Sequence, residues 1–313
     1  MAMFTKATRK KSKLRLALCG TSGSGKTYSA LLVAKGLGGK CAVIDTENGS
    51  ASLYEGVTDY DVCEIAPPYT VEKYIAAIHE AEKEGYNVLI IDSLSHAWAG
   101  QGGLLEEVDK KTAASRSKNS YTAWRDVTPL HNKLVDTILQ SSMHIIVTMR
   151  TKTAYEINKN DNNGKTEITK VGLAPIQRDG LEYEFTVVLD LENSKHMATA
   201  GKDRTGIFDG KAFVANEETG HQLLEWLEKG ADIPSTQKQR SEIFVKATEL
   251  NISSDEMKKI LKIKYDIESS KELTMSQAND LKNNIEKYHQ DVSSCKANDA
   301  ILDNALDLAM EQK

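Results

Sequence analysis

Eight consecutive residues near the N-terminus have types and spacing that could cradle phosphate. They are Gly20-Thr21-Ser22-Gly23-Ser24-Gly25-Lys26-Thr27, which match the pattern G-x-x-x-x-G-K-[ST]. Glycines let the backbone wrap closely around a triphosphate, so that successive N–H groups point inward. We expect Lys26 to reach the β- and γ-phosphates and the Thr27 hydroxyl to ligate Mg²⁺. The segment therefore predicts an ATP site, to which we also assign the next residue, Tyr28.

The segments on either side of this loop support the same interpretation. An apolar run at residues 14–19 precedes the loop, and a helical pattern of apolar residues at 30–37 follows it. The helix would place the partial positive charge of its N-terminus at the phosphates. A simple glycine turn is the alternative, but the order of strand, loop and helix argues against it.

Two acidic residues that end apolar runs are candidates for the catalytic chemistry. Asp92 closes the run 88–91, where a Walker-B acid would hold Mg²⁺, although such an acid can also belong to a plain turn. Hydrolysis also needs a carboxylate that polarises the attacking water. The residue after Asp92 is Ser93, so we assign this role to Glu47, at the end of the run 43–47, with a helix-capping acid as the alternative.

Composition limits the classes of protein that fit. The 313 residues carry 40% hydrophobic and 27% charged side chains and a net charge of −5, which is ordinary for a soluble globular protein and argues against a uniformly basic coat. No segment approaches the roughly 18 apolar residues of a membrane span. The four cysteines are widely spaced, so neither a zinc site nor a disulfide framework is indicated: Cys19, Cys41, Cys63 and Cys295.

Alternating strands and helices must position these residues. The apolar runs 41–45, 88–92 and 144–148 are short enough for buried strands. Helical spacing is present at 70–84, and another helix is expected to begin at Thr128 with Pro129 at its first position. This order predicts an α/β fold with a mainly parallel sheet between helices.

The rest of the chain predicts a sheet edge and a small helical region. Residues 185–191, 196–200 and 211–215 are strand candidates, and a short helix is expected at 221–229. Capping boxes at Ser253/Glu256 and Thr274/Gln277 predict later helices. The expected organisation is a basic arm at 1–13, an ATPase core at 14–230, a linker at 231–240, a helical domain at 241–290 and an acidic tail at 291–313.

Three of these features resemble the RecA family. A glutamate at Glu47 is similar to that family's catalytic glutamate, and Tyr54, seven residues later, stands where its tyrosine stacks on adenine; a core or surface tyrosine is the alternative. Lys202 and Arg204 resemble the basic pair that reaches a neighbouring subunit's γ-phosphate, although a solvated basic turn fits equally. The resemblance implies hydrolysis coupled to self-association into an oligomer or filament.

The resemblance covers roughly residues 14–215 and is greatest to minimal RecA-core ATPases that phages encode beside single-strand annealing proteins. One position departs from the pattern. Where bacterial RecA has an Asn-Gln pair that senses the γ-phosphate, this chain has Thr148-Met149-Arg150. Thr148 or Arg150 could take this role, and we take Arg150 as the candidate phosphate sensor. The resemblance implies a RecA-like P-loop fold in the cytoplasm of a bacterial host cell.

Two segments correspond to the loops that contact single-stranded DNA in RecA-like proteins. They are residues 99–120 and 151–180, and we expect both to be loops. Basic residues occur in each, although acidic residues nearly balance those of the second. The aromatic candidates for base stacking, all of which could instead be packing residues, are Trp98, Tyr121, Trp124 and Tyr155.

The sequence therefore predicts a Mg²⁺-dependent ATPase that binds single-stranded DNA and acts in phage recombination, annealing or replication. A single-strand binding or annealing protein is a further expected partner. Two alternatives remain open. One is a replicative helicase or helicase loader, and the other is a nucleotide-gated module that recruits a protein partner through the C-terminal helices.

Overall fold

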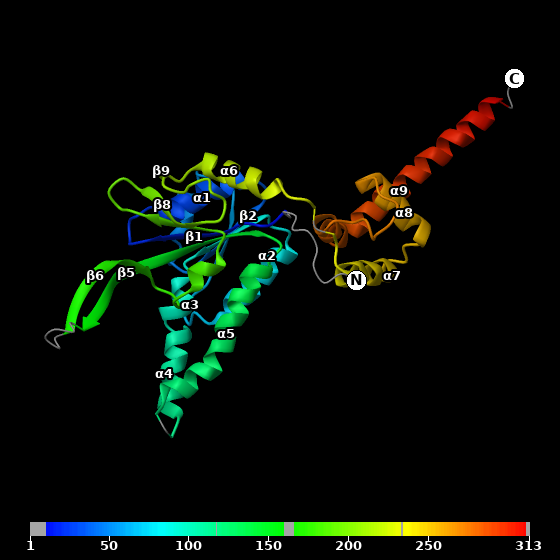
Figure 1. The fold of residues 1–313 in the computed structure, drawn as a ribbon. Coiled ribbons are helices and arrows are strands. Elements are labelled where there is room, and N and C mark those ends of the chain that lie inside the picture. Colours follow the sequence, from blue (N-terminus) through cyan, green and yellow to red (C-terminus); the bar gives the residue numbers. More distant parts are fainter. Residues whose placement is uncertain (1–10, 117, 160–165, 233, 311–313) are drawn as a thin grey trace, which may run out of the picture. The chain divides into compact units, whose positions relative to one another are not determined.

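The computed structural model describes residues 11–116, 118–159, 166–232 and 234–310. The chain divides into two compact units, Ser12–Glu228 and a smaller unit built mainly from the residues after Glu228. Figure 1 shows the sheet and the helices of both units. Residues 1–10 of the predicted basic arm and the tip of the second predicted loop, residues 160–165, lie outside the described residues.

A mixed sheet forms the centre of the larger unit. In the described part of the chain it has nine strands in the order β3-β2-β4-β5-β1-β7-β8-β9, and β6 pairs with β5. The strands from β3 to β7 in this order are parallel, and β6, β8 and β9 pair antiparallel. The predicted α/β fold with a mainly parallel sheet is confirmed. The strands are β1 (Arg15–Gly20), β2 (Cys41–Asp45), β3 (Asp61–Glu64), β4 (Val88–Asp92), β5 (His144–Lys159), β6 (Thr166–Pro175), β7 (Val187–Leu191), β8 (Met197–Asp203) and β9 (Ala212–Val214).

Helices cover both faces of this sheet, because side chains along a strand alternate between its two faces. In β1, Leu16 and Leu18 pack beneath α1 and α6, whereas Ala17 and Cys19 face the layer of α2 to α5 (Figure 1). Short 3-10 helices, η1 and η2, join some of the elements. The bounds are α1 (Lys26–Leu37), η1 (Ala51–Tyr54), α2 (Val71–Lys83), α3 (Ser95–Ala99), α4 (Leu104–Ala114), α5 (Ser120–Gln140), η2 (Leu181–Glu184) and α6 (Glu217–Glu228).

Two glycines bring α1 and α6 into backbone contact. A Cβ atom on Gly36 would lie 1.9 Å from the Glu217 carbonyl oxygen, and one on Gly220 would lie 2.2 Å from the Val33 carbonyl oxygen. Any larger side chain at either position would therefore collide with main chain, which cannot move aside cheaply. This contact fixes the helix that follows the phosphate loop against its neighbour.

The long helix α5 differs from its prediction. It begins at Ser120 rather than Thr128, because the Asn119 side chain caps it by accepting a hydrogen bond from the Tyr121 N–H, and Pro129 lies inside the helix. Its C-terminal end is held by the buried Arg15, whose guanidinium donates to the carbonyl oxygens of Leu139, Ser141 and Met143, among others. Burial lowers the pKa of Arg15 to about 10.

Both segments expected to be loops are instead regular structure. Residues 99–120 are largely α4, which packs along α5, and residues 151–180 are largely the hairpin of β5 and β6 (Figure 1). The second segment was expected to be a loop from its position in RecA-like proteins, whereas antiparallel pairing satisfies the backbone hydrogen bonds of its described strands. We refer to α4 with α5 as the helical arm and to β5 with β6 beyond Arg150 as the hairpin arm.

The smaller unit contains α7 (Gln237–Glu249), α8 (Ser254–Tyr265) and α9 (Met275–Met310) around its own hydrophobic cluster. The capping-box hydrogen bonds at Ser253/Glu256 and Thr274/Gln277 are present. A further capping box at Thr236 starts α7 inside the predicted linker 231–240. The segment expected to be an acidic tail from residue 291 continues α9 as helix to Met310.

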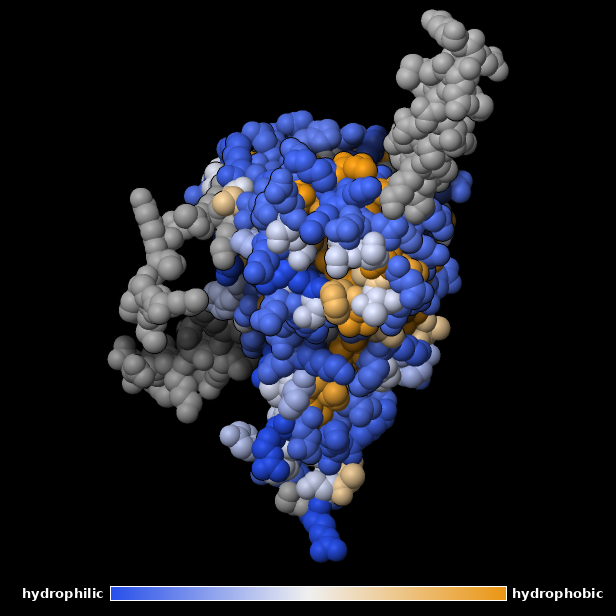
Figure 2. All heavy atoms as spheres, turned by 90° about the vertical axis from the view of Figure 1, so that its right-hand side faces the viewer, coloured by the Kyte–Doolittle hydropathy of each residue, from blue (hydrophilic) through white to orange (hydrophobic). Residues whose placement is uncertain are grey.

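The surface and the helices agree with the polar composition. Figure 2 shows a face on which hydrophilic side chains predominate and hydrophobic ones occur in small groups. Among the described helices, none has the length and apolar character needed to cross a membrane. Cys19 and Cys41 are buried free thiols and Cys63 is an exposed one, whereas the Cys295 side chain lies outside the described residues.

We expect Gly220→Ala to lower the free energy of unfolding by about 1–3 kcal/mol, because the added methyl group would overlap the Val33 carbonyl in a packed interface. This loss outweighs the gain of about 1 kcal/mol that alanine usually brings to a helix. Urea unfolding would measure it, with Gly56→Ala as the control because a Cβ there meets nothing within 4 Å. Equal midpoints for the two variants would contradict the packing argument.

Candidate nucleotide-binding site

The phosphate loop connects the end of β1 to the start of α1. Gly23 and Gly25 have φ angles of 79° and 84°, a left-handed conformation that glycine adopts without steric cost. The Lys26 ammonium donates a 2.8 Å hydrogen bond to the Thr21 carbonyl oxygen. Burial lowers the pKa of Lys26, while the nearby carboxylates of Asp92 and Glu47 act in the opposite direction. The described partner of Lys26 is thus a neutral carbonyl, which a phosphate can replace.

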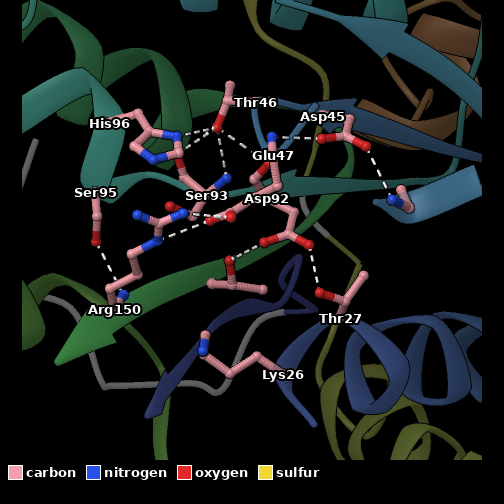
Figure 3. A network of polar contacts seen from close by, with 12 residues as sticks. Lys26, Thr27, Asp45, Thr46, Glu47, Asp92, Ser93, Ser95, His96 and Arg150 are labelled. Carbon is pink, nitrogen blue, oxygen red and sulfur yellow. Dashed lines mark hydrogen bonds and ion pairs between the residues drawn. The ribbon is translucent and has the colours of Figure 1, made fainter. Parts of the chain in front are cut away.

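Asp92 links the loop helix to two strands. Its Oδ2 atom accepts a 2.6 Å hydrogen bond from the Thr27 hydroxyl, and its Oδ1 atom accepts a 2.5 Å bond from the Thr148 hydroxyl on β5 (Figure 3). Asp92 is 2% exposed. Burial raises its pKa, against the two hydroxyl hydrogen bonds that lower it. Sequence reasoning predicted Asp92 and Thr27 and considered Thr148 as a phosphate sensor, but it did not foresee the contact of Thr148 with Asp92.

Glu47 and Arg150 form an ion pair beside this group. Both Glu47 oxygens accept from the guanidinium: Arg150 Nε donates at 2.9 Å and a terminal nitrogen donates to the other oxygen (Figure 3). Burial pushes the pKa of Glu47 upward, but Arg150, with help from His96 and Lys26, outweighs burial and lowers the pKa. Glu47 is therefore ionised near neutral pH, as a group that polarises water must be.

Sequence reasoning assigned no role in the site to three residues around Glu47: Asp45, Thr46 and His96. Asp45 is buried at the end of β2 and accepts hydrogen bonds from the backbone N–H groups of Glu47, at 2.6 Å, and Ala51, at 2.9 Å. The Thr46 hydroxyl accepts from the Ser93 N–H at 2.8 Å and lies 2.7 Å from His96 Nδ1. The sequence shows Asp45 at the end of an apolar run, so this acid could have been identified. No pattern in the sequence indicates that Thr46 contacts His96, 50 residues later.

The two predicted tyrosines meet near the start of α1. Tyr28 and Tyr54 pack edge to face, with ring centroids 5.8 Å apart. Tyr28 is 46% exposed, and Tyr54 is partly buried against the core beneath α1. Tyr28 therefore belongs to the first turn of α1, where it presents an aromatic surface to solvent, and Tyr54 packs against it.

Lys202 and Arg204 lie away from the loop of their own chain. Lys202 pairs with Val188, which pairs with Ala17 in the middle of β1, three residues before the phosphate loop begins at Gly20. Arg204 donates a 2.9 Å hydrogen bond to the Tyr183 carbonyl oxygen, and Lys202 donates to the same atom. The structure thus does not bring this basic pair to the Lys26 group.

The aromatic candidates for base stacking separate into two groups. Trp98 and Trp124 are partly buried and stack on each other, with ring centroids 5.6 Å apart, so they pack the base of the helical arm. Tyr121 is 81% exposed at the start of α5. The Tyr155 side chain lies outside the described residues.

These residues fit a nucleotide with Mg²⁺. The loop offers left-handed glycines, a lysine that is held by a carbonyl, and a threonine that contacts a buried aspartate. Mg²⁺ commonly takes one or two protein ligands and completes its shell with waters and phosphate oxygens. Thr27 and Asp92 can supply those ligands, and bound Mg²⁺ would neutralise charge on the phosphates. The fold and the site together define a P-loop nucleoside triphosphatase.

Comparison with protein families agrees with this class. The sequence model described as an AAA domain matches residues 12–217, about two thirds of the chain. The chain therefore belongs to the AAA domain family, and this unit is an ATPase-type nucleotide-binding domain. Comparison with curated proteins found no match.

Asp92→Asn should stabilise the nucleotide-free protein at pH 8 and remove the Mg²⁺ dependence of nucleotide binding. An acid whose pKa is raised by folding contributes stability at low pH that is lost as the pH rises through the folded-state pKa. A pKa difference of one between the folded and unfolded states corresponds to about 1.4 kcal/mol in the free energy of unfolding. The asparagine side chain keeps two polar atoms for Thr27 and Thr148 but carries no buried charge.

Urea unfolding at pH 5 and pH 8, with and without Mg-ATP, measures both effects. The exposed Asp136→Asn serves as the control and should behave as wild type at both pH values. The assignment of Asp92 as a Mg²⁺ ligand fails if its variant keeps Mg²⁺-dependent nucleotide binding. The argument from burial fails if the stability of the variant relative to wild type does not increase with pH.

Proposed function

We propose that this protein is a RecA-like, Mg²⁺-dependent ATPase that binds single-stranded DNA as an oligomer and acts in phage recombination, annealing or replication. One observation carries the proposal. Glu47 follows β2 at the edge of the sheet where the phosphate loop lies, and it is paired with Arg150, the residue from which the hairpin arm extends. Glu47, the candidate for activating water, is therefore bound directly to the base of the hairpin arm.

In this proposal Glu47 orients the attacking water, while Lys26 and Mg²⁺ neutralise charge on the phosphates. The Arg150 guanidinium donates to both Glu47 oxygens. A γ-phosphate is a competing anion for this guanidinium, and its arrival would free Glu47 to hold water. Arg150 thereby acts as the phosphate sensor.

The two arms supply the proposed contact with DNA. Both begin at the carboxyl ends of the parallel strands, the same edge of the sheet as the phosphate loop, because α3 follows β4 and the hairpin arm continues β5. Ligands of such sheets bind at this edge. The helical arm offers the exposed ring of Tyr121 for base stacking, and exposed basic side chains on the arms could contact phosphate: Lys110, Lys111, Arg116, Lys118, Arg125 and Lys152.

Lys202 and Arg204 are proposed to complete the site of a neighbouring subunit. Both side chains donate to the Tyr183 carbonyl and not to the loop of their own chain, so we assign them to the nucleotide of a neighbour. Their hydrogen bonds to the Tyr183 carbonyl hold two positive charges side by side. The pKa of Lys202 is lowered, mainly by burial and to a lesser extent by the positive charge of Arg204. An incoming γ-phosphate would relieve that repulsion. Hydrolysis is then coupled to assembly.

Single-stranded DNA should raise the rate of ATP hydrolysis by the wild-type protein. Glu47→Gln should lower kcat by about 100-fold or more and leave ATP binding intact, because the amide cannot polarise water. Steady-state hydrolysis with and without DNA measures both. Glu84→Gln, an exposed glutamate that follows α2, is the control. A rate that DNA leaves unchanged would refute the DNA-dependent proposal while leaving the ATPase assignment intact.

A mixing experiment tests the neighbour's contribution. Lys202→Ala and Glu47→Gln should each be inactive alone, but their mixture should recover activity, since an intact Glu47 can then meet an intact Lys202 across an interface. Lys211→Ala removes another lysine held by a carbonyl and should stay active. Full activity of Lys202→Ala alone, or no recovery on mixing, argues against the role in trans.

A further inference from the structure

The turn between β7 and β8 lies against the phosphate loop, although it is about 170 residues away in sequence. Asn193 in this turn makes two hydrogen bonds to the loop. The Thr21 hydroxyl donates to Asn193 Oδ1 at 2.6 Å, and Asn193 Nδ2 donates to the Ser22 carbonyl oxygen at 2.7 Å. We infer that Asn193 is a positioning residue that keeps the phosphate loop in its nucleotide-binding conformation.

The chemistry of the contact fixes the orientation of the amide. The Ser22 carbonyl can only accept a hydrogen bond, so the NH₂ group of Asn193 must face it. The amide oxygen is then directed at the Thr21 hydroxyl, which can donate. One planar side chain thus holds two successive loop residues, one by its side chain and one by its main chain.

Two other glycines of the loop lie near the same turn. A Cβ on Gly23 would lie 3.7 Å from Asn193 Nδ2, and one on Gly25 would lie 3.2 Å from the His196 ring. The start of the loop is held differently, because Gly20 pairs with Leu191, the last residue of β7. The turn therefore lies along the middle and the end of the loop, and Asn193 makes its hydrogen bonds to the loop.

Nucleotide binding should make this contact more important. Thr21 is held by Lys26 Nζ on its carbonyl oxygen as well as by Asn193 on its hydroxyl. When a phosphate takes the ammonium, the loop loses the first contact, and Asn193 keeps the Thr21–Ser22 segment in place. A loop that is ordered beforehand loses less conformational entropy on binding, which increases affinity.

The inference rests on nucleotide binding at the loop, and its test uses neither DNA nor hydrolysis. Binding of a fluorescent ADP to the full chain should be about three- to tenfold weaker for Asn193→Ala, as two surface hydrogen bonds would predict. The thermal midpoint should not change, and KM for ATP should rise while kcat is retained. Asn193→Asp should weaken binding similarly, because its carboxylate repels the Ser22 carbonyl.

Two further variants separate positioning from a general effect of the turn. Ser194→Ala removes a neighbouring hydroxyl that contacts Glu192 and should bind ADP as wild type does. Thr21→Ala should weaken binding, and the double variant with Asn193→Ala should lose less than the product of the two single effects.

Unchanged ADP affinity for Asn193→Ala, an equal loss for Ser194→Ala, or a fall in kcat at constant KM would each overturn the inference. Wild-type protein that binds ADP while DNA leaves its ATPase rate unchanged would refute the proposed function but not this role of Asn193. The two conclusions can therefore fail separately.

Discussion

The buried carboxylate of Asp92 is the point on which the site depends. It ends β4, yet its two oxygens are held by hydroxyls from α1 and β5, so one side chain ties the loop helix to two adjacent strands. A charge at this depth is costly unless it is paired or hydrogen-bonded. The same cost makes Asp92 a ready partner for a divalent cation, which would replace the weak compensation by two neutral hydroxyls.

The packing around α1 follows from this constraint. Thr27 can meet Asp92 only if the first turn of α1 is held at a fixed height over the sheet. The glycine contact between α1 and α6 fixes the helix from outside, and the apolar residues of β1 fix it from below. The turn at Asn193 holds the other end of the loop. The loop is thus restrained from three sides before any nucleotide arrives.

The arms and the site share an edge of the sheet because the strands are parallel. Ser95 at the start of α3 accepts a 2.9 Å hydrogen bond from the Arg150 N–H, and the Arg150 carbonyl accepts one from Ile176 at the base of the hairpin arm. The ion pair with Glu47 therefore lies at the base of the hairpin arm, beside the start of α3.

The sequence alone determined the phosphate loop, the parallel α/β order, the acid at Asp92 and the candidate Glu47, because these depend on short spacing and on apolar runs of strand length. It could not place contacts between distant segments: Thr148 with Asp92, His96 with Thr46, and Asn193 with the loop. It also treated the two arms as loops, since hairpin pairing and helix packing are set by partners rather than by local pattern. Tertiary structure decided these features because parallel strands bring residues far apart in the chain to one edge, where hydrogen bonds select among them.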